Sequence, residues 1–166
     1  MTKYNYKNCQ SLFGYSAEVH IRCGGKCQLC GCGGDPIDFN LWRQMTVEHL
    51  IGKSQSGYLE QVYEVVRDKL PDYPELEIDT ICKEIDSFNT VSACQFCNST
   101  TSREISPVSM GDLISSSEPN PDSILKNVQA ACHGILVSKR NKVQWKLESV
   151  KEAFHKYVEP NIVGSS

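Results

Sequence analysis

The sequence of 166 residues lacks long hydrophobic runs, and its net charge of −3 is small. No stretch approaches the roughly 18–20 apolar residues that span a bilayer, which argues against a transmembrane helix. The N-terminal stretch MTKYNYKNCQSLF has neither the apolar core of a signal peptide nor the arginine-rich, acid-poor composition of a transit peptide. With 40% apolar and 22% charged residues, the composition is that of an ordinary globular protein. We therefore expect one domain, residues 1–166, that is intracellular (cytoplasm or nucleus) and contacts no membrane.

Cysteine, in contrast, is abundant, with nine residues in the chain. In a reducing compartment an odd and dense set of cysteines more often binds metal than forms disulfides. Two C-x-x-C pairs, Cys27/Cys30 and Cys94/Cys97, can each form a tight turn that presents two thiolates to one ion. The spacing predicts a structural zinc site with these four ligands, and Cys32 is an alternative ligand. The other cysteines are expected to be buried thiols: Cys9, Cys23, Cys82 and Cys132.

Hydrophobic periodicity and breaker residues predict a mostly helical chain with a small strand region. Helices are expected over residues 16–23, 58–70, 75–88, 124–136 and 147–158, with a short helix near Asn98. One or two strands are expected within residues 39–51, ending near His49. The stretch SSSEPNPDS, residues 115–123, is expected to be a loop.

Charge is unevenly distributed along the chain. Residues 54–88 carry nine acidic and three basic residues, whereas residues 139–166 carry six basic and three acidic residues. The densest basic stretch contains Lys139, Arg140 and Lys142, close to Trp145. These side chains are candidates for contacts with nucleic-acid phosphates. A solvated surface segment is an equally good interpretation of the same residues.

Among the four histidines, His49 has the most informative context. It directly follows Glu48 at the expected end of a strand, and a carboxylate beside an imidazole can place a metal ligand next to a general base. An exposed strand terminus is the alternative interpretation. The remaining histidines lie in helical patterns and are expected to be packed or solvated: His20, His133 and His155.

Three segments then follow one another in a characteristic order: RCGGKCQLCG (residues 22–31), TVEHLIGKSQSG (residues 46–57) and FNTVSACQFCNS (residues 88–99). A cysteine turn, an acid–histidine pair, an asparagine before the second cysteine turn and an asparagine directly after it resemble the HNH endonuclease family. That family has a ββα-metal (His-Me finger) core, which two C-x-x-C pairs often brace. The resemblance covers residues 16–57 and 88–105.

The resemblance implies a role for four residues. His49 would be the general base that activates water for attack on a phosphodiester. Glu48 and Asn98 would bind a catalytic divalent cation, and Asn89 would hold the loop between the strands and so orient the base. Taken without the resemblance, Asn89 and Asn98 are more simply explained as turn or helix-cap residues.

The sequence thus predicts a small α/β (α+β) protein with a zinc-stapled ββα-metal core. An acidic helical insertion would occupy residues 58–87, and a helical extension residues 106–166. The expected function is a metal-dependent endonuclease that acts on DNA, with RNA as an open alternative, and that uses Mg²⁺ or Mn²⁺ for catalysis and Zn²⁺ for structure. A noncatalytic zinc-stabilised nucleic-acid-binding module and a thiol redox protein are the rivals. The oligomeric state stays open, and a dimer is one option.

Overall fold

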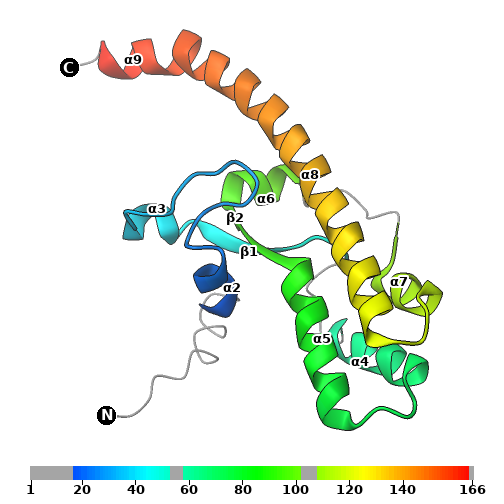
Figure 1. The fold of residues 1–166 in the computed structure, drawn as a ribbon. Helices are drawn as coiled ribbons and strands as arrows, with labels where there is room; N and C mark the ends of the chain where they lie inside the picture. The colour runs from blue at the N-terminus through cyan, green and yellow to red at the C-terminus, as the bar shows by residue number, and fades with distance from the viewer. Residues whose placement is uncertain (1–16, 53–57, 102–107, 165–166) are drawn as a thin grey trace, which may run out of the picture.

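A computed structural model describes residues 17–52, 58–101 and 108–164, and its elements are labelled as in Figure 1. Helices predominate, and the described residues contain one sheet of two strands. In chain order the elements are α2 (Ala17–Arg22), α3 (Phe39–Trp42), β1 (Met45–His49), α4 (Tyr58–Lys69), α5 (Glu75–Asn89), β2 (Thr90–Cys94), α6 (Gln95–Thr101), α7 (Met110–Ser116), α8 (Pro121–Ala153), the π-helical η1 (Phe154–Val158) and α9 (Glu159–Val163). The expected combination of many helices with a small strand region is confirmed.

The two strands pair antiparallel at the centre of the molecule (Figure 1). Met45 lies opposite Cys94 at one end of the pairing, and His49 lies opposite Thr90 at the other. Helix α6 begins directly after β2 and packs against both strands. Helices α4 and α5 form the connection between the strands. The sheet and α6 thus bring together chain segments that the sequence separates by the whole acidic stretch.

Residues Phe39–Trp42 form helix α3, which the sequence did not predict, whereas a strand within residues 39–51 that ends at His49 is present as expected. The cause is a local cap. The side chain of Asp38 accepts a hydrogen bond from the backbone N–H of Leu41 at 2.8 Å, which satisfies a donor in the first turn. The strand itself begins only at Met45.

The main hydrophobic core lies between the helices below the sheet in Figure 1. Apolar residues spaced three or four positions apart place one face of each helix toward the others. Helices α4, α5, α7 and α8 all contribute; their most buried side chains include Val66, Ile85, Ile114, Ile124 and Val128. A second, smaller core surrounds the cysteines; its members are Cys27, Leu29, Met45, Ala93, Cys94, Cys97 and Val143.

Helix α8 is continuous over 33 residues, whereas the sequence predicted two separate helices. Its start is well specified, because the side chain of Asn120 accepts from the N–H of Ser123 at 2.9 Å and Pro121 occupies the first turn. No proline follows until Pro160, beyond the end of α8, and the charged residues in between are good helix formers. The loop expected at residues 115–123 is correspondingly short.

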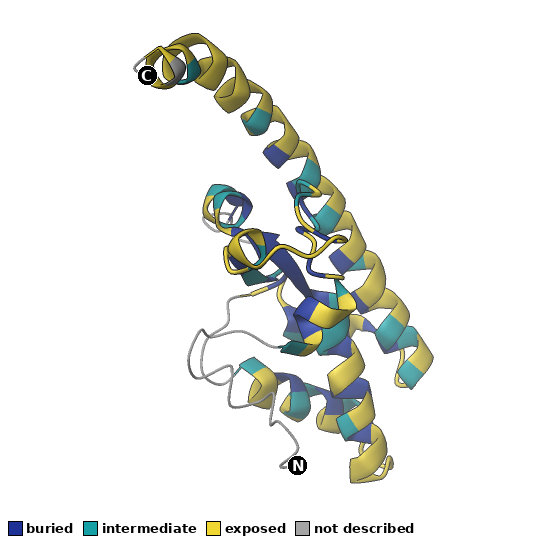
Figure 2. Cartoon of the chain, turned by 90° about the vertical axis from the view of Figure 1, so that its left-hand side faces the viewer, coloured by how far each residue is buried: buried dark blue, intermediate teal, exposed yellow. Residues whose placement is uncertain are grey.

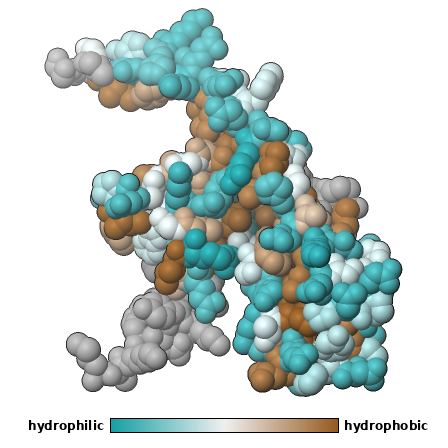
Figure 3. Space-filling view, viewed as in Figure 1, coloured by the Kyte–Doolittle hydropathy of each residue, from teal (hydrophilic) through white to brown (hydrophobic). Residues whose placement is uncertain are grey.

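The last turns of α8, together with η1 and α9, project beyond the body of the molecule (Figures 1 and 2). Trp145 is 77% exposed there, and Phe154, Tyr157 and Ile162 are exposed as well. Figure 3 shows hydrophobic side chains along this projecting part. Among the described helices, none combines the length and apolarity needed to cross a membrane.

This division of α8 into a packed half and a projecting half can be tested with one substitution at two positions. Val128→Ala removes a fully buried side chain and should lower the free energy of unfolding by about 2 kcal/mol. Val150→Ala, in the same helix at 44% exposure, should change it by less than about 0.5 kcal/mol. Urea denaturation measures both values. Equal losses would show that the projecting half is packed in solution.

Candidate functional site

Four cysteine thiols form a compact cluster. The sulfur atoms of Cys27, Cys30, Cys32 and Cys94 all lie within 4.8 Å of one another. Cys30 Sγ and Cys94 Sγ are 3.9 Å apart, although 64 positions separate the two residues in the chain. Four sulfur ligands at this spacing are suited to a structural metal ion such as zinc.

The first cysteine turn is a narrow hairpin with defined backbone geometry. Lys26 and Gly33 form an antiparallel bridge, and the N–H of Cys27 donates to the carbonyl of Cys32 at 2.8 Å. The N–H of Cys30 points at Cys27 Sγ, at 3.4 Å. Gly33 has φ +84°, and a Cβ there would lie 2.7 Å from the carbonyl oxygen of Gly25. The glycine-rich sequence therefore serves to fold this turn tightly around its thiols.

Cys97, the fourth ligand expected from the C-x-x-C spacing, is fully buried in the same small core. Cys97 nevertheless lies outside the set of four cysteines whose sulfur atoms are all within 4.8 Å of one another. The alternative noted from the sequence, Cys32, is inside that set. The choice between Cys32 and Cys97 as the fourth ligand therefore stays a prediction.

The electrostatics of the cluster favour a bound cation. Hydrogen bonds from the thiols of Cys94 and Cys97 lower the pKa of Cys27 far below its usual range. Burial raises the pKa of Cys32, and the hydrogen bond to Cys27 raises the pKa of Cys97. One thiolate is therefore stabilised at the expense of its neighbours. A metal ion would supply the positive charge that lets several of them ionise together.

Among the other described cysteines, two are buried as expected, and Cys23 is only partly buried. Cys82 and Cys132 are buried in the helical core, and burial raises their pKa to about 11 and about 12 respectively. Cys23 is half-buried at the edge of that core. Cys9 lies outside the described residues.

Three hydrogen bonds attach the cysteine hairpin to the rest of the fold. The N–H of Gln28 donates to the carbonyl of Ser92 in β2 at 2.8 Å, and Ser92 Oγ donates to the carbonyl of Lys26 at 2.5 Å. From the other side, Arg140 Nε on α8 donates to the carbonyl of Gln28 at 2.7 Å. The hairpin is therefore held between the sheet and α8.

His49 lies at the last position of β1, half-buried beside the helical core. Its ring meets that of Tyr58 edge to face, with the centroids 5.6 Å apart. Burial lowers the pKa of His49, and the nearby carboxylates of Asp86 and Glu48 oppose this shift. The neutral imidazole that results is the form that can accept a proton.

Asn89 fixes the chain directly after His49. Its amide nitrogen donates to the carbonyl of Ile51 at 2.9 Å, and its amide oxygen accepts from the N–H of Ile51 at 2.7 Å. The same amide nitrogen also donates to the hydroxyl of Tyr58 at 2.7 Å. Asn89 is completely buried, and it therefore connects the segment after His49 with the aromatic ring that packs on His49.

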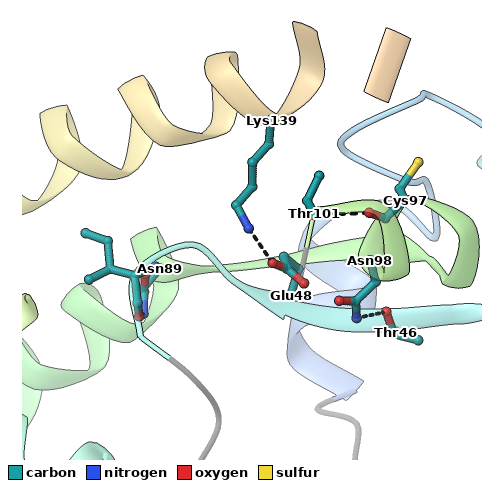
Figure 4. A network of polar contacts seen from close by, with 8 residues as sticks. Thr46, Glu48, Asn89, Cys97, Asn98, Thr101 and Lys139 are labelled. Atoms are coloured by element: carbon teal, nitrogen blue, oxygen red, sulfur yellow. Dashed lines mark hydrogen bonds and ion pairs between the residues drawn. The ribbon is translucent and has the colours of Figure 1, made fainter. Parts of the chain in front are cut away.

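Glu48 and Asn98 lie on the same side of β1. Asn98, in α6, donates from its amide nitrogen to Thr46 Oγ1 at 2.7 Å. Thr46 and Glu48 are two positions apart in a strand, so their side chains share one face. Figure 4 shows Asn98 reaching from α6 toward Thr46, and Glu48 pointing toward Lys139. Because the amide nitrogen of Asn98 is the donor to Thr46, its oxygen is the atom that could act as a ligand.

The structure places the three basic residues of the 139–142 stretch in different environments. Lys139 is buried, and its Nζ lies 2.5 Å from Oε1 of Glu48 (Figure 4). This differs from the exposed position that contact with phosphates would require. Arg140 is half-buried on the cysteine hairpin, and Lys142 is exposed. Only Lys142 has the exposure that was expected of the whole stretch.

The sequence did not point to three residues near the candidate site. These are Tyr58, Asp86 and Lys139, of which Lys139 forms the ion pair with Glu48. Asp86 precedes Asn89 by three positions in α5, so the helical repeat places both on one face, and this spacing could have pointed to it. The positions of Tyr58 and Lys139 depend on how α4 and α8 pack, for which the sequence carries no local signal.

Comparisons with known proteins add nothing to this geometry: no protein-family model, no curated protein and no solved structure matches the chain.

The cysteine cluster predicts that the folded protein carries about one zinc ion per chain. Cys94→Ser should remove most of the bound zinc and strongly destabilise the protein, because the hairpin and β2 would lose their shared ion. Cys82→Ser, which alters a buried thiol outside the cluster, should leave the zinc content unchanged. Elemental analysis of purified, folded protein measures both. A well-folded wild type without zinc would contradict the metal site.

Cys32→Ser and Cys97→Ser identify the fourth ligand. One of these variants should lose zinc to a chelator much faster than the wild type, and the other should keep it, because a tetrahedral ion accepts four thiolates from the five available. The loss of bound zinc during titration with a chelator is the measurement. Unchanged zinc retention in both variants would show that the site does not need a single defined fourth cysteine.

Asn89→Ala should lower the free energy of unfolding by about 2–4 kcal/mol, because it leaves the buried N–H and carbonyl of Ile51 without their partners. Asn141→Ala, at an exposed position of α8, should change it by less than about 0.5 kcal/mol. Chemical denaturation gives both values. Amide hydrogen exchange at Leu50 and Ile51 should also accelerate in Asn89→Ala, and unaltered exchange there would show that Asn89 does not hold this segment.

Proposed function

We propose that this protein is a metal-dependent endonuclease of the HNH type that hydrolyses phosphodiester bonds in DNA. The observation that carries the proposal is the position of Asn89. Its side chain binds both backbone polar groups of Ile51, two residues after His49, although 39 residues separate His49 from Asn89 in the chain. This is the contact expected if an asparagine orients the loop that follows a catalytic histidine.

The order of elements is compatible with this proposal. A strand that ends at His49, an antiparallel strand that follows Asn89 and a helix that carries Asn98 occur in that order. Each of the four residues singled out by the family resemblance lies on β1, at the end of α5 or on α6, around one small sheet.

His49 would accept the proton of the attacking water. Its position at a strand end, beside Tyr58 and the Asn89-bound segment, restricts the ring without filling every side of it. Positioned acid–base groups of this kind contribute about 10²–10⁴-fold to a rate.

Glu48 and Asn98 would hold the catalytic divalent cation. A carboxylate oxygen and an amide oxygen on one face of β1 are hard ligands of the kind that Mg²⁺ and Mn²⁺ accept. When bound, such an ion stabilises negative charge on the phosphate and the leaving oxygen. The cysteine cluster would have the separate task of holding the hairpin and β2 together.

The DNA partner is supported by exposed basic and aromatic side chains on α8. Lys142, Trp145 and Lys146 lie on the exposed part of this helix, beyond the buried Lys139. Lysines can neutralise phosphates, and an exposed tryptophan can stack on an unpaired base. RNA stays an open alternative for the same reason.

His49→Ala tests the proposal. Cleavage of plasmid DNA in the presence of Mg²⁺ or Mn²⁺ should fall by about 10²–10⁴-fold, while zinc content and DNA affinity stay at wild-type values, because the imidazole contributes little to the core. His133→Ala, at an exposed position of α8, is the matched control and should cleave normally.

Two outcomes would contradict the proposal. Wild-type cleavage by His49→Ala would show that His49 is not the base. If the wild-type protein binds DNA but does not cleave it, whichever divalent ion is added, the noncatalytic binding module would be favoured. The burial of Glu48 against Lys139 is the observation that favours this second function, because a lysine ammonium already occupies the carboxylate.

A further inference from the structure

The ion pair of Lys139 and Glu48 is the most enclosed charged contact among the described residues. Its Nζ–Oε1 distance is 2.5 Å, and each side chain is 7% exposed. The other ion pairs of the described chain, such as Lys83 with Asp79, lie at the surface. A charged pair buried to this degree is costly to separate, since either charge left alone would lack both water and a partner.

Helix α8 holds Lys139 at this place through contacts on both sides of it. About two turns earlier, Cys132 Sγ lies 3.8 Å from Oδ1 of Asn89. One position later, Arg140 donates to the carbonyl of Gln28, and Val143 packs in the small core of the cysteines. Helix α8 therefore holds the ammonium group of Lys139 beside Glu48, because the helix itself contacts Asn89, the cysteine hairpin and the small core of the cysteines.

We propose that Lys139 occupies the cation position at Glu48, and that a divalent ion binds this carboxylate only when the ammonium group withdraws. Lys139 is thus the residue that determines whether the site accepts a divalent ion. The inference deepens the proposed function and rests on it for the role of Glu48 as a metal ligand.

The reason is electrostatic. The positive charge of Lys139 cancels the attraction that Glu48 has for a cation, and an ammonium group beside a divalent ion repels it strongly at low dielectric. Asn98 offers an uncharged oxygen and cannot compensate. Replacing Lys139 by an uncharged side chain of similar length should therefore convert a weak cation site into a stronger one.

The experiment measures Mn²⁺ binding to the full-length, zinc-loaded chain by electron paramagnetic resonance, without nucleic acid. Lys139→Met should bind Mn²⁺ about 10-fold more tightly than the wild type. Lys139→Arg, which retains the charge, and Lys142→Met, which removes an exposed charge from the same helix, should stay within about threefold of the wild type. The double variant Lys139→Met/Glu48→Gln should lose the gained affinity, which assigns it to Glu48.

Unchanged or weaker Mn²⁺ binding by Lys139→Met would overturn the proposal, and so would a gain that persists in the double variant. Thermal unfolding and zinc content establish that each variant is folded, and Lys139→Gln replaces Lys139→Met if the latter does not fold. Mn²⁺ should also raise the melting temperature of Lys139→Met, but not that of the wild type.

The measurement is independent of cleavage. A gain in Mn²⁺ affinity through Glu48 in a protein that never cuts DNA would support the inference and reject the endonuclease. Cleavage that depends on His49, combined with unaltered Mn²⁺ binding in Lys139→Met, would support the endonuclease and reject the inference.

Discussion

The attachment of one cysteine hairpin to the end of β2 is the constraint on which the candidate site depends. The core around the hairpin is small, and its buried members are three cysteines together with Leu29, Met45, Ala93 and Val143. Such a core contributes little free energy, so a shared metal ion is an effective way to hold it. Because β2 pairs with β1 residue by residue from Cys94 to Thr90, fixing the cysteine end of the sheet also fixes the end that carries His49.

Helix α8 provides the second support for the same region. It contacts Asn89 through Cys132, Glu48 through Lys139 and the hairpin through Arg140. These positions follow one another at intervals of seven and one, so they lie on one broad face of the helix. The C-terminal segment is thus an integral part of the site, although the family resemblance ends before it. The same helix also places Lys139 beside Glu48, the carboxylate that the proposed chemistry needs.

The elements that the sequence predicted well are those with a strong local pattern. Helices α4 and α5 were predicted from their apolar periodicity and from the two prolines between them, Pro71 and Pro74. The cysteine turns were predicted from the spacing of their cysteines. The sequence was misleading where a short-range detail decided the outcome, as with the Asp38 cap that makes residues 39–42 helical. It was silent where the outcome depends on packing. The number of charges in residues 139–142 is visible in the sequence, but the burial of Lys139 against Glu48 depends on the position of a whole helix.

The long acidic connection between the strands does not disturb the site, and the reason lies in the sheet. In an antiparallel pair the connection leaves and re-enters at the same end, and here the N–H of Leu50 donates to the carbonyl of Asn89 at 2.9 Å. The entropy of closing such a connection grows only slowly with its length, and α4 and α5 bury their own apolar faces against α7 and α8. The inserted segment is therefore stabilised by its packing against α7 and α8. Because Asn89 is the last residue of α5, the packing of that helix also sets the position of the asparagine that holds the segment after His49.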